Sequence, residues 1–129
     1  MESDVLVVDD SAAIRKILQR VLRQTGMAIR TIHEAGDGQE ALAVLGAQKI
    51  DLVLSDINMP KMDGLQLLAS IKATAQWKQI PVVMITTEGG ETKVSEAVKL
   101  GAAGYVRKPF TADQIKEKLA GILDPAMPL

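Results

Sequence analysis

Short, almost uninterrupted apolar runs alternate along this chain with segments of helical periodicity, and that alternation limits the fold more than any other feature. The clearest runs cover residues 5–8, 52–54 and 81–85. Strands that are covered on both faces read as continuous apolar runs, whereas a strand with one face in water alternates apolar and polar residues. The three runs therefore predict central strands, at 5–8, 50–55 and 81–86, in a sheet that carries helices on both sides.

Between these runs, apolar residues recur every three or four positions, as they do on one face of a helix. Ile14, Ile17, Leu18, Val21 and Leu22 show this spacing most clearly. Four further helices are predicted by the same spacing and by two capping patterns, Asp37 with Glu40 and Thr111 with Gln114. These helices lie near residues 37–45, 65–71, 94–101 and 111–123, and Val94, Ala97 and Val98 mark the apolar face of the third of them.

Residues 30–34 give a weaker strand pattern and residues 105–107 a short one, so that five strands alternate with five helices. A chain of 129 residues fits one domain, which we expect to cover residues 1–124, followed by a loose tail at 125–129. Strands joined by helical crossovers pair in parallel. The predicted fold is α/β, a single-domain open doubly wound sheet, in which ligands bind beyond the carboxyl ends of the strands.

Charged and hydroxyl side chains occur at that edge of the predicted sheet. Asp9 and Asp10 follow the first strand, Asp56 follows the third, Thr86 ends the fourth and Lys108 follows the fifth. Each is ordinary alone, since an acid after a strand often caps the next helix and a lone lysine is usually exposed. Three carboxylates about 5 Å apart, however, repel by roughly 3 kcal/mol per pair at an effective dielectric of about 20, which one lysine cannot offset. A divalent cation with oxygen ligands can, and Mg²⁺ suits such a site.

The overall charge and the absence of long apolar segments exclude several classes of partner. A net charge of −1 argues against nucleic acid or an anionic membrane as a bulk electrostatic partner. The chain has no cysteine, begins with Met-Glu-Ser-Asp without a signal-peptide pattern, and has no apolar run of membrane-spanning length. We expect a cytoplasmic domain that binds neither nucleic acid nor membrane directly.

Several short motifs, spread over nearly the whole chain, occur together in one protein family. They are Val8-Asp9-Asp10-Ser11, Asp56 with Met59-Pro60 and Asp63-Gly64, Thr86, and Lys108-Pro109-Phe110. In combination they resemble the receiver domains of two-component response regulators. The closer similarity is to stand-alone chemotaxis receivers of the CheY type, through Ile14-Arg15, Glu88, Gly101-Ala102-Ala103-Gly104-Tyr105 and Thr111. This resemblance implies a flavodoxin-like sheet with strand order 2-1-3-4-5 and five helices.

The resemblance also implies a phosphorylation site. Asp56 would be the nucleophile that accepts a phosphoryl group from a sensor histidine kinase, with Mg²⁺ as cofactor. Asp10, Asp56 and the backbone carbonyl of Asn58 would bind the metal directly, and Asp9 would act mainly through a metal-bound water. Asn58 and Glu88 would tune dephosphorylation, for which a phosphatase is a further candidate partner. Such a protein is not an enzyme for another substrate, because it catalyses only its own Mg²⁺-dependent phosphorylation and dephosphorylation.

A conformational switch follows from the same resemblance. Thr86 and Lys108 would bond to phosphoryl oxygens, and the Tyr105 ring would turn inward as Thr86 moves. Tyr105 and Lys118 would then form the surface for an output protein, such as a flagellar motor switch component. The implied function is that of a single-domain response regulator in chemotaxis.

Three other functions fit part of the pattern. A flavodoxin-like FMN binder would share the fold, but Asp9 and Asp10 would repel a bare phosphate after the first strand. An aspartyl-nucleophile phosphatase would also use an acid at a strand end, but usually with a second acid two residues on, where this chain has Asn58. The nearest alternative is a receiver domain from a longer regulator with a DNA-binding or enzymatic output, and the length of the native gene distinguishes the two.

Overall fold

The computed structural model describes residues 3–59, 61–86, 91–108 and 110–123. Strands and helices alternate throughout, as predicted. The strands are β1 (Ser3–Val8), β2 (Ile29–Ala35), β3 (Leu52–Asp56), β4 (Val82–Thr86) and β5 (Gly104–Arg107). The helices are α1 (Ala12–Gln24), α2 (Gly38–Ala47), α3 (Gly64–Ala73), α4 (Glu91–Leu100) and α5 (Ala112–Leu123).

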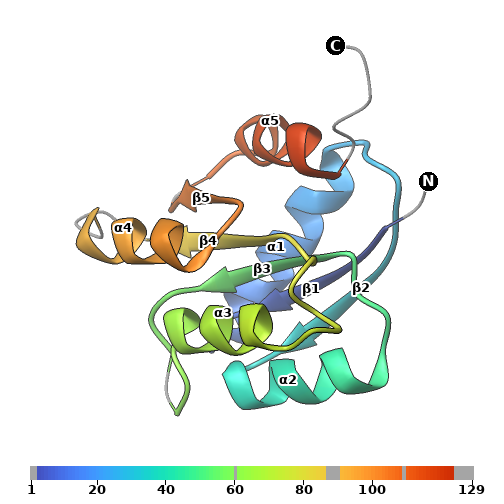
Figure 1. Cartoon of the computed structure of the whole chain (residues 1–129). Helices are drawn as coiled ribbons and strands as arrows, with labels where there is room; N and C mark the ends of the chain where they lie inside the picture. Colours follow the sequence, from blue (N-terminus) through green and yellow to red (C-terminus); the bar gives the residue numbers. More distant parts are fainter. Residues whose placement is uncertain (1–2, 60, 87–90, 109, 124–129) are drawn as a thin grey trace.

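The strands form one parallel sheet in the order β2-β1-β3-β4-β5, which confirms the predicted topology (Figure 1). In the register of the sheet, Val8 pairs with Ser55, Asp56 pairs with Ile85, and Thr86 pairs with Arg107. The carboxyl ends of the central strands therefore meet at one edge. The strand order reverses between β1 and β3, which is where doubly wound sheets bind ligands.

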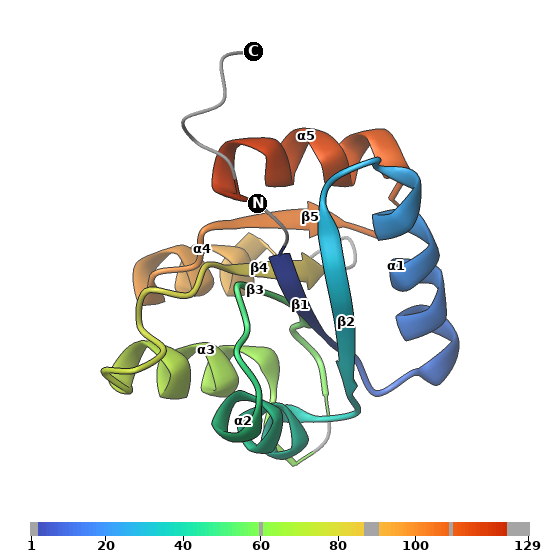
Figure 2. The ribbon, with the colours of Figure 1, turned by 90° about the vertical axis from the view of Figure 1, so that its right-hand side faces the viewer.

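Two apolar cores lie on opposite faces of the sheet. Helices α1 and α5 cover one face, and α2, α3 and α4 cover the other (Figure 2). Successive strand residues alternate between the cores, so that Leu6 and Val8 pack under α2 and α3 while Val5 and Val7 pack under α1 and α5. All four are fully buried, which explains why the strand sequences are apolar without interruption.

Most helix ends follow the capping signals in the sequence. The Ser11 side chain caps α1 by accepting a hydrogen bond from the Ile14 N–H, and Gly26 takes the left-handed conformation just beyond that helix, with φ of 74°. The predicted capping box at Thr111 forms both of its bonds with Gln114. At α2 only half of the predicted box is present among the described residues, since Asp37 accepts from the Glu40 N–H at 2.9 Å without a return bond.

Two residues of the predicted apolar helix faces lie in solvent. Ile17 on α1 is 43% exposed and Val98 on α4 is 58% exposed. Ile17 sits at the margin of its apolar stripe, whose centre is formed by Leu18, Val21 and Leu22, because the helical turn of 100° per residue places it well to one side. The longest described helix has 13 residues, and none in the described part of the chain is long and apolar enough to cross a bilayer.

Candidate functional site

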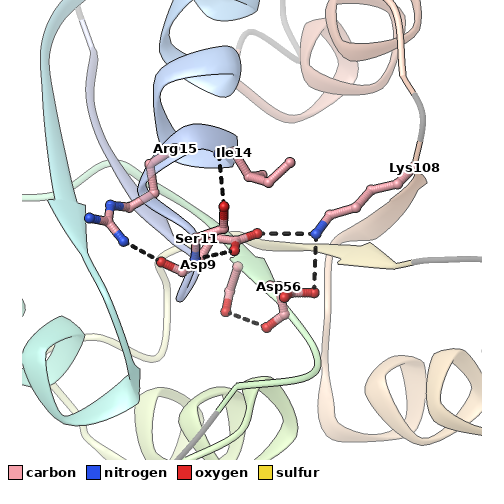
Figure 3. A network of polar contacts seen from close by, with 7 residues as sticks. Asp9, Ser11, Ile14, Arg15, Asp56 and Lys108 are labelled. Atoms are coloured by element: carbon pink, nitrogen blue, oxygen red, sulfur yellow. Dashed lines mark hydrogen bonds and ion pairs between the residues drawn. The ribbon is translucent and has the colours of Figure 1, made fainter.

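The predicted site residues gather at the carboxyl edge of the sheet because backbone hydrogen bonds extend the pairing past the strand ends. The Asp9 N–H donates to the Ala35 carbonyl at 3.1 Å, and the Lys108 N–H donates to the Thr86 carbonyl at 2.7 Å. These bonds hold the loops after β1 and β5 against neighbouring strands. Figure 3 shows the resulting cluster, in which Asp9, Asp56 and Lys108 point toward one another.

Three carboxylates form the centre of this cluster. One oxygen from each of Asp9, Asp10 and Asp56 lies within 4.8 Å of the others. Asp9 and Asp56 are 1% and 7% exposed, whereas Asp10 faces solvent. At this separation each ionised pair repels by roughly 3 kcal/mol at an effective dielectric of about 20. An all-oxygen set of this size, open to solvent on one side, fits a hard divalent cation that retains several waters, as Mg²⁺ does.

Lys108 supplies the compensating positive charge. Its Nζ lies 3.1 Å from Asp9 Oδ2 and 3.6 Å from Asp56 Oδ1, and its side chain is only 19% exposed. One ammonium therefore neutralises part of a cluster of three acids. The sequence placed Lys108 at this edge, and the structure adds that its shorter contact is with Asp9 rather than with Asp56.

The environment of Asp56 disfavours its ionised form. Burial raises the pKa of this carboxyl above its ordinary value, the charge of Lys108 opposes that rise, and the neighbouring charge of Asp9 adds to it. A cation bound at the three carboxylates would favour the ionised form, which is the nucleophilic one. Binding of a cation at the three carboxylates and ionisation of Asp56 would therefore favour each other.

The loop after β1 is held mainly through Asp9. One Asp9 carboxylate oxygen accepts a hydrogen bond from the Ser11 N–H at 2.9 Å, and its backbone carbonyl accepts one from the Arg15 guanidinium at 2.6 Å. Ser11 and Arg15 carried no functional prediction beyond their place in the motif. The only sequence feature that pointed to the Arg15 contact was an arginine five residues after an acid pair. That spacing does not indicate that the arginine binds a backbone carbonyl.

Gly64 allows α3 to begin directly against Asp56. A β-carbon at this position would lie 2.2 Å from the Asp56 carbonyl oxygen and 2.8 Å from the Ile57 Cα. The Gly64 N–H also donates to the Ile57 carbonyl at 2.7 Å. The loop between β3 and α3 therefore closes tightly behind the candidate nucleophile, and only glycine leaves room for it.

The other predicted site residues are only partly described. Thr86 is the last residue of β4 and is 5% exposed, next to the site edge. Asn58 is exposed in the loop after β3, two residues beyond Asp56. Glu88 lies outside the described residues, so that its predicted role remains a prediction.

Tyr105 and Lys118 lie apart from the carboxylates, on β5 and α5. The Tyr105 ring is 44% exposed, and Lys118 Nζ lies over it at 5.5 Å from the ring centroid. Both side chains line a surface cavity of about 350 Å³, together with Val106, Arg107, Gln114 and Glu117. In the register of the sheet Tyr105 pairs with Met84, two residues before Thr86. Because side chains two apart share a face, Tyr105 and Thr86 lie on the same face of neighbouring strands.

Comparisons with known proteins agree with this geometry. A family model for the response regulator receiver domain matches residues 5–120. The chain is 42% identical over 120 residues to chemotaxis protein CheY-3 of Vibrio cholerae, covering 93% of this chain and 91% of that protein. The structure of chemotaxis protein CheY4 of Vibrio cholerae matches with a TM-score of 0.85 at 34% identity, over 95% of this chain and 100% of that one. The structure of NtrX from Brucella abortus matches with a TM-score of 0.84 at 35% identity, over 97% of this chain but 27% of that one. The chain therefore belongs to the response regulator receiver domain family.

Proposed function

We propose that this receiver domain accepts a phosphoryl group on Asp56 from a sensor histidine kinase and signals through a change of conformation. The observation that carries the proposal is the position of Asp56. Asp56 ends β3 with a side chain that is only 10% exposed, and its carboxylate lies within 4.8 Å of two other acids and 3.6 Å from a lysine ammonium. Charged groups placed this closely around a buried carboxylate suit phosphoryl transfer, because positioning and electrostatic stabilisation supply most of the catalysis of that reaction.

The transfer step needs no other nucleophile from the chain. A carboxylate oxygen of Asp56 attacks the phosphorus of the phosphohistidine, the P–N bond breaks, and the leaving imidazole nitrogen keeps the bonding electrons. Lys108, already 3.1 Å from Asp9 and 3.6 Å from Asp56, is within reach of an oxygen on the incoming group. The domain catalyses its own phosphorylation and dephosphorylation and is not an enzyme for another substrate.

Mg²⁺ is the proposed cofactor. Asp10, Asp56 and the backbone carbonyl of Asn58 would hold it, with Asp9 acting mainly through a water. The ion supplies charge neutralisation on the transferring group. Support comes from the solvent-facing Asp10 beside two buried carboxylates, since an open side leaves room for the waters that Mg²⁺ retains.

The signal is proposed to pass from Thr86 to Tyr105. A hydrogen bond to a charged group contributes about 1.5–3 kcal/mol, and taking a two-state domain from 1:99 to 99:1 requires roughly 5.5 kcal/mol. Bonds from both Thr86 and Lys108 to the phosphoryl group can together approach that value, whereas one cannot. Movement of Thr86 would open space for the Tyr105 ring, which now faces outward beside Lys118.

The proposed setting is chemotaxis in the cytoplasm. The output partner would be a protein such as a flagellar motor switch component, bound at the surface around Tyr105 and Lys118, and a phosphatase is a candidate for resetting the signal. Support comes from CheY-3 and CheY4 of Vibrio cholerae, which are chemotaxis proteins and which this chain matches over 91% and 100% of their lengths.

A second candidate function is that of a receiver domain within a longer regulator. The match to NtrX favours it, because this chain covers only 27% of the NtrX chain. The length of the native gene separates the two. A reading frame that continues into a DNA-binding or enzymatic domain would favour the longer regulator.

Phosphorylation is tested with acetyl phosphate and Mg²⁺, followed by mass spectrometry of the intact protein. One phosphoryl mass should appear on the wild type, disappear in Asp56→Asn, and persist in Asp113→Asn, whose exposed acid lies on α5. EDTA should abolish labelling of the wild type. Labelling that survives in Asp56→Asn would refute the assignment.

The output surface is tested by NMR chemical-shift mapping with the phosphoryl mimic beryllofluoride. Changes should extend from the acid cluster to Tyr105 and Lys118. Changes confined to the residues around Asp56 would show that output uses another face.

A further inference from the structure

Arg15 makes an unusual contact for a helix residue, because its guanidinium reaches back to the loop that precedes its own helix. Its NH1 donates to the Asp9 backbone carbonyl at 2.6 Å, as Figure 3 shows. Its Nε donates to Glu34 Oε1 on β2 at 3.0 Å, and its side chain is only 18% exposed. Two bonds in different directions therefore fix the plane of the guanidinium.

The carbonyl that Arg15 binds belongs to the same peptide unit as the Asp10 nitrogen. Because a peptide unit is planar, fixing the Asp9 oxygen also fixes the direction in which the chain enters Asp10. The Asp9 side chain is held by the Ser11 N–H and by Lys108. Asp10 has no such restraint, since its exposed carboxylate has no hydrogen bond or ion pair with a described residue. Its position depends on the backbone that carries it.

We propose that Arg15 is a positioning residue for the metal site, and that it acts by holding the Asp9–Asp10 peptide so that the Asp10 carboxylate stays within ligand distance of the other two acids. Glu34 acts in turn on Arg15 by fixing its orientation. This inference rests on the proposed function only in taking Mg²⁺ as the ion bound by Asp10 and Asp56.

If Arg15 acted only through its charge, its removal would change the affinity for Mg²⁺ in the opposite direction from a loss of positioning. A guanidinium near the three acids repels a divalent cation, so its removal should tighten Mg²⁺ binding if the arginine acts only through its charge. Loss of positioning should weaken binding, because partners that orient a metal ligand typically contribute about 10–100-fold to metal affinity. The direction of the change in the Mg²⁺ dissociation constant therefore distinguishes the two roles.

The chain offers a matched control on the same helix. Arg23 NH1 donates to the Ile29 backbone carbonyl at 2.7 Å, which is the same type of bond, made at the other end of α1 and far from the acids. Replacing either arginine by glutamine removes one charge and one arginine–carbonyl bond, and Arg15→Gln also removes the bond to Glu34. A merely structural role of Arg15 would make the two variants alike.

The test is an Mg²⁺ titration of the full chain, followed through backbone amide shifts, together with the melting temperature of each variant without metal. Arg15→Gln should raise the Mg²⁺ dissociation constant by about tenfold. Arg15→Lys should raise it too, because one ammonium does not reproduce the two-directional fork. Arg23→Gln should leave the constant within about twofold of wild type, whatever its melting temperature.

An unchanged or lower dissociation constant in Arg15→Gln would overturn the inference, as would an equal rise in Arg23→Gln. If Arg15→Gln does not fold, Arg15→Lys provides the test, because it keeps the positive charge and loses the two-directional fork. If the wild type and the Arg15 variants bind Mg²⁺ equally well, only the proposed role of Arg15 is refuted. A wild type that does not bind Mg²⁺ refutes the proposed metal site as well.

Discussion

Replacing Gly64 by alanine should strongly destabilise this protein, although replacing glycine by alanine within a helix ordinarily increases stability. The added β-carbon would lie 2.2 Å from the Asp56 carbonyl oxygen, 2.8 Å from the Ile57 Cα and 2.8 Å from the Met84 methyl carbon. The first two atoms belong to the backbone and cannot rotate away. Either α3 or the end of β3 must therefore shift.

The magnitude follows from the size of this overlap. A β-carbon essentially never approaches another heavy atom to less than 3.0 Å, so backbone atoms must move by most of an ångström. Overpacking a well-filled site costs about 1–3 kcal/mol, occasionally more, and we expect the upper end, about 3 kcal/mol, because the neighbours are backbone. The total stability of a domain is only about 5–15 kcal/mol. A loss of this size should lower the melting temperature by roughly 10 °C.

Gly46→Ala is the matched control. Gly46 lies in α2, and a β-carbon there would have no heavy atom within 4 Å. The substitution should therefore stabilise the helix by about 0.5–1 kcal/mol. Urea unfolding of both variants at pH 7 measures the two effects, which should have opposite signs.

The site should respond as well, since the shift displaces Asp56 itself. Mg²⁺ should raise the melting temperature of Gly64→Ala less than that of Gly46→Ala. A Gly64→Ala protein as stable as Gly46→Ala would refute the reasoning, because it would show that the β3–α3 loop yields without cost.

Three further predictions concern charge and signalling. Asp56→Asn should raise the melting temperature in metal-free buffer at pH 7, because burial and the charge of Asp9 disfavour the ionised carboxylate and raise its pKa. Because the pKa of Asp56 is raised in the folded state, protonation stabilises the folded wild type as the pH falls. The difference in melting temperature between the variant and the wild type should therefore shrink as the pH falls through that pKa. A difference that grows on acidification would contradict this. Arg30→Gln should lower the melting temperature at pH 7, because the hydrogen bond and charge of Arg30 lower the pKa of Asp4 in the folded state. The difference from wild type should shrink as the pH falls through that lowered pKa, where the stabilisation is lost. A difference that stays constant on acidification would mean that Arg30 acts through packing. Thr86→Ala should accept phosphate on Asp56 yet bind the output partner more weakly after phosphorylation, and partner titration that gives wild-type affinity would exclude Thr86 from the switch.

Several features of the fold could be predicted because they depend on residues that are close in the sequence. The apolar runs at β1, β3 and β4 fixed the central strands, and the capping pattern at Thr111 fixed the start of α5 through both of its bonds. The pattern at Asp37 was less reliable, since only one of its two bonds forms.

Exposure was harder to predict than secondary structure. Val98 has the helical spacing of a core residue but is 58% exposed, whereas its neighbour Ala97 is 2% exposed. The sequence shows that a helix is amphipathic, but the direction of its apolar face depends on how α4 lies on the sheet. That direction is set by packing against β4 and α3.

The sequence by itself determined the alternation of strands and helices and the type of chemistry at the sheet edge. Periodicity and residue type are local properties, and parallel pairing brings every strand end to the same side. Only the tertiary structure decided which atoms meet there. The Lys108 ammonium contacts Asp9 across 99 residues of sequence, the Arg15 guanidinium binds a carbonyl rather than a carboxylate, and Gly64 leaves room for the Asp56 carbonyl. These contacts depend on strand register and on how closely helices approach the sheet, and both are fixed only when the two cores pack.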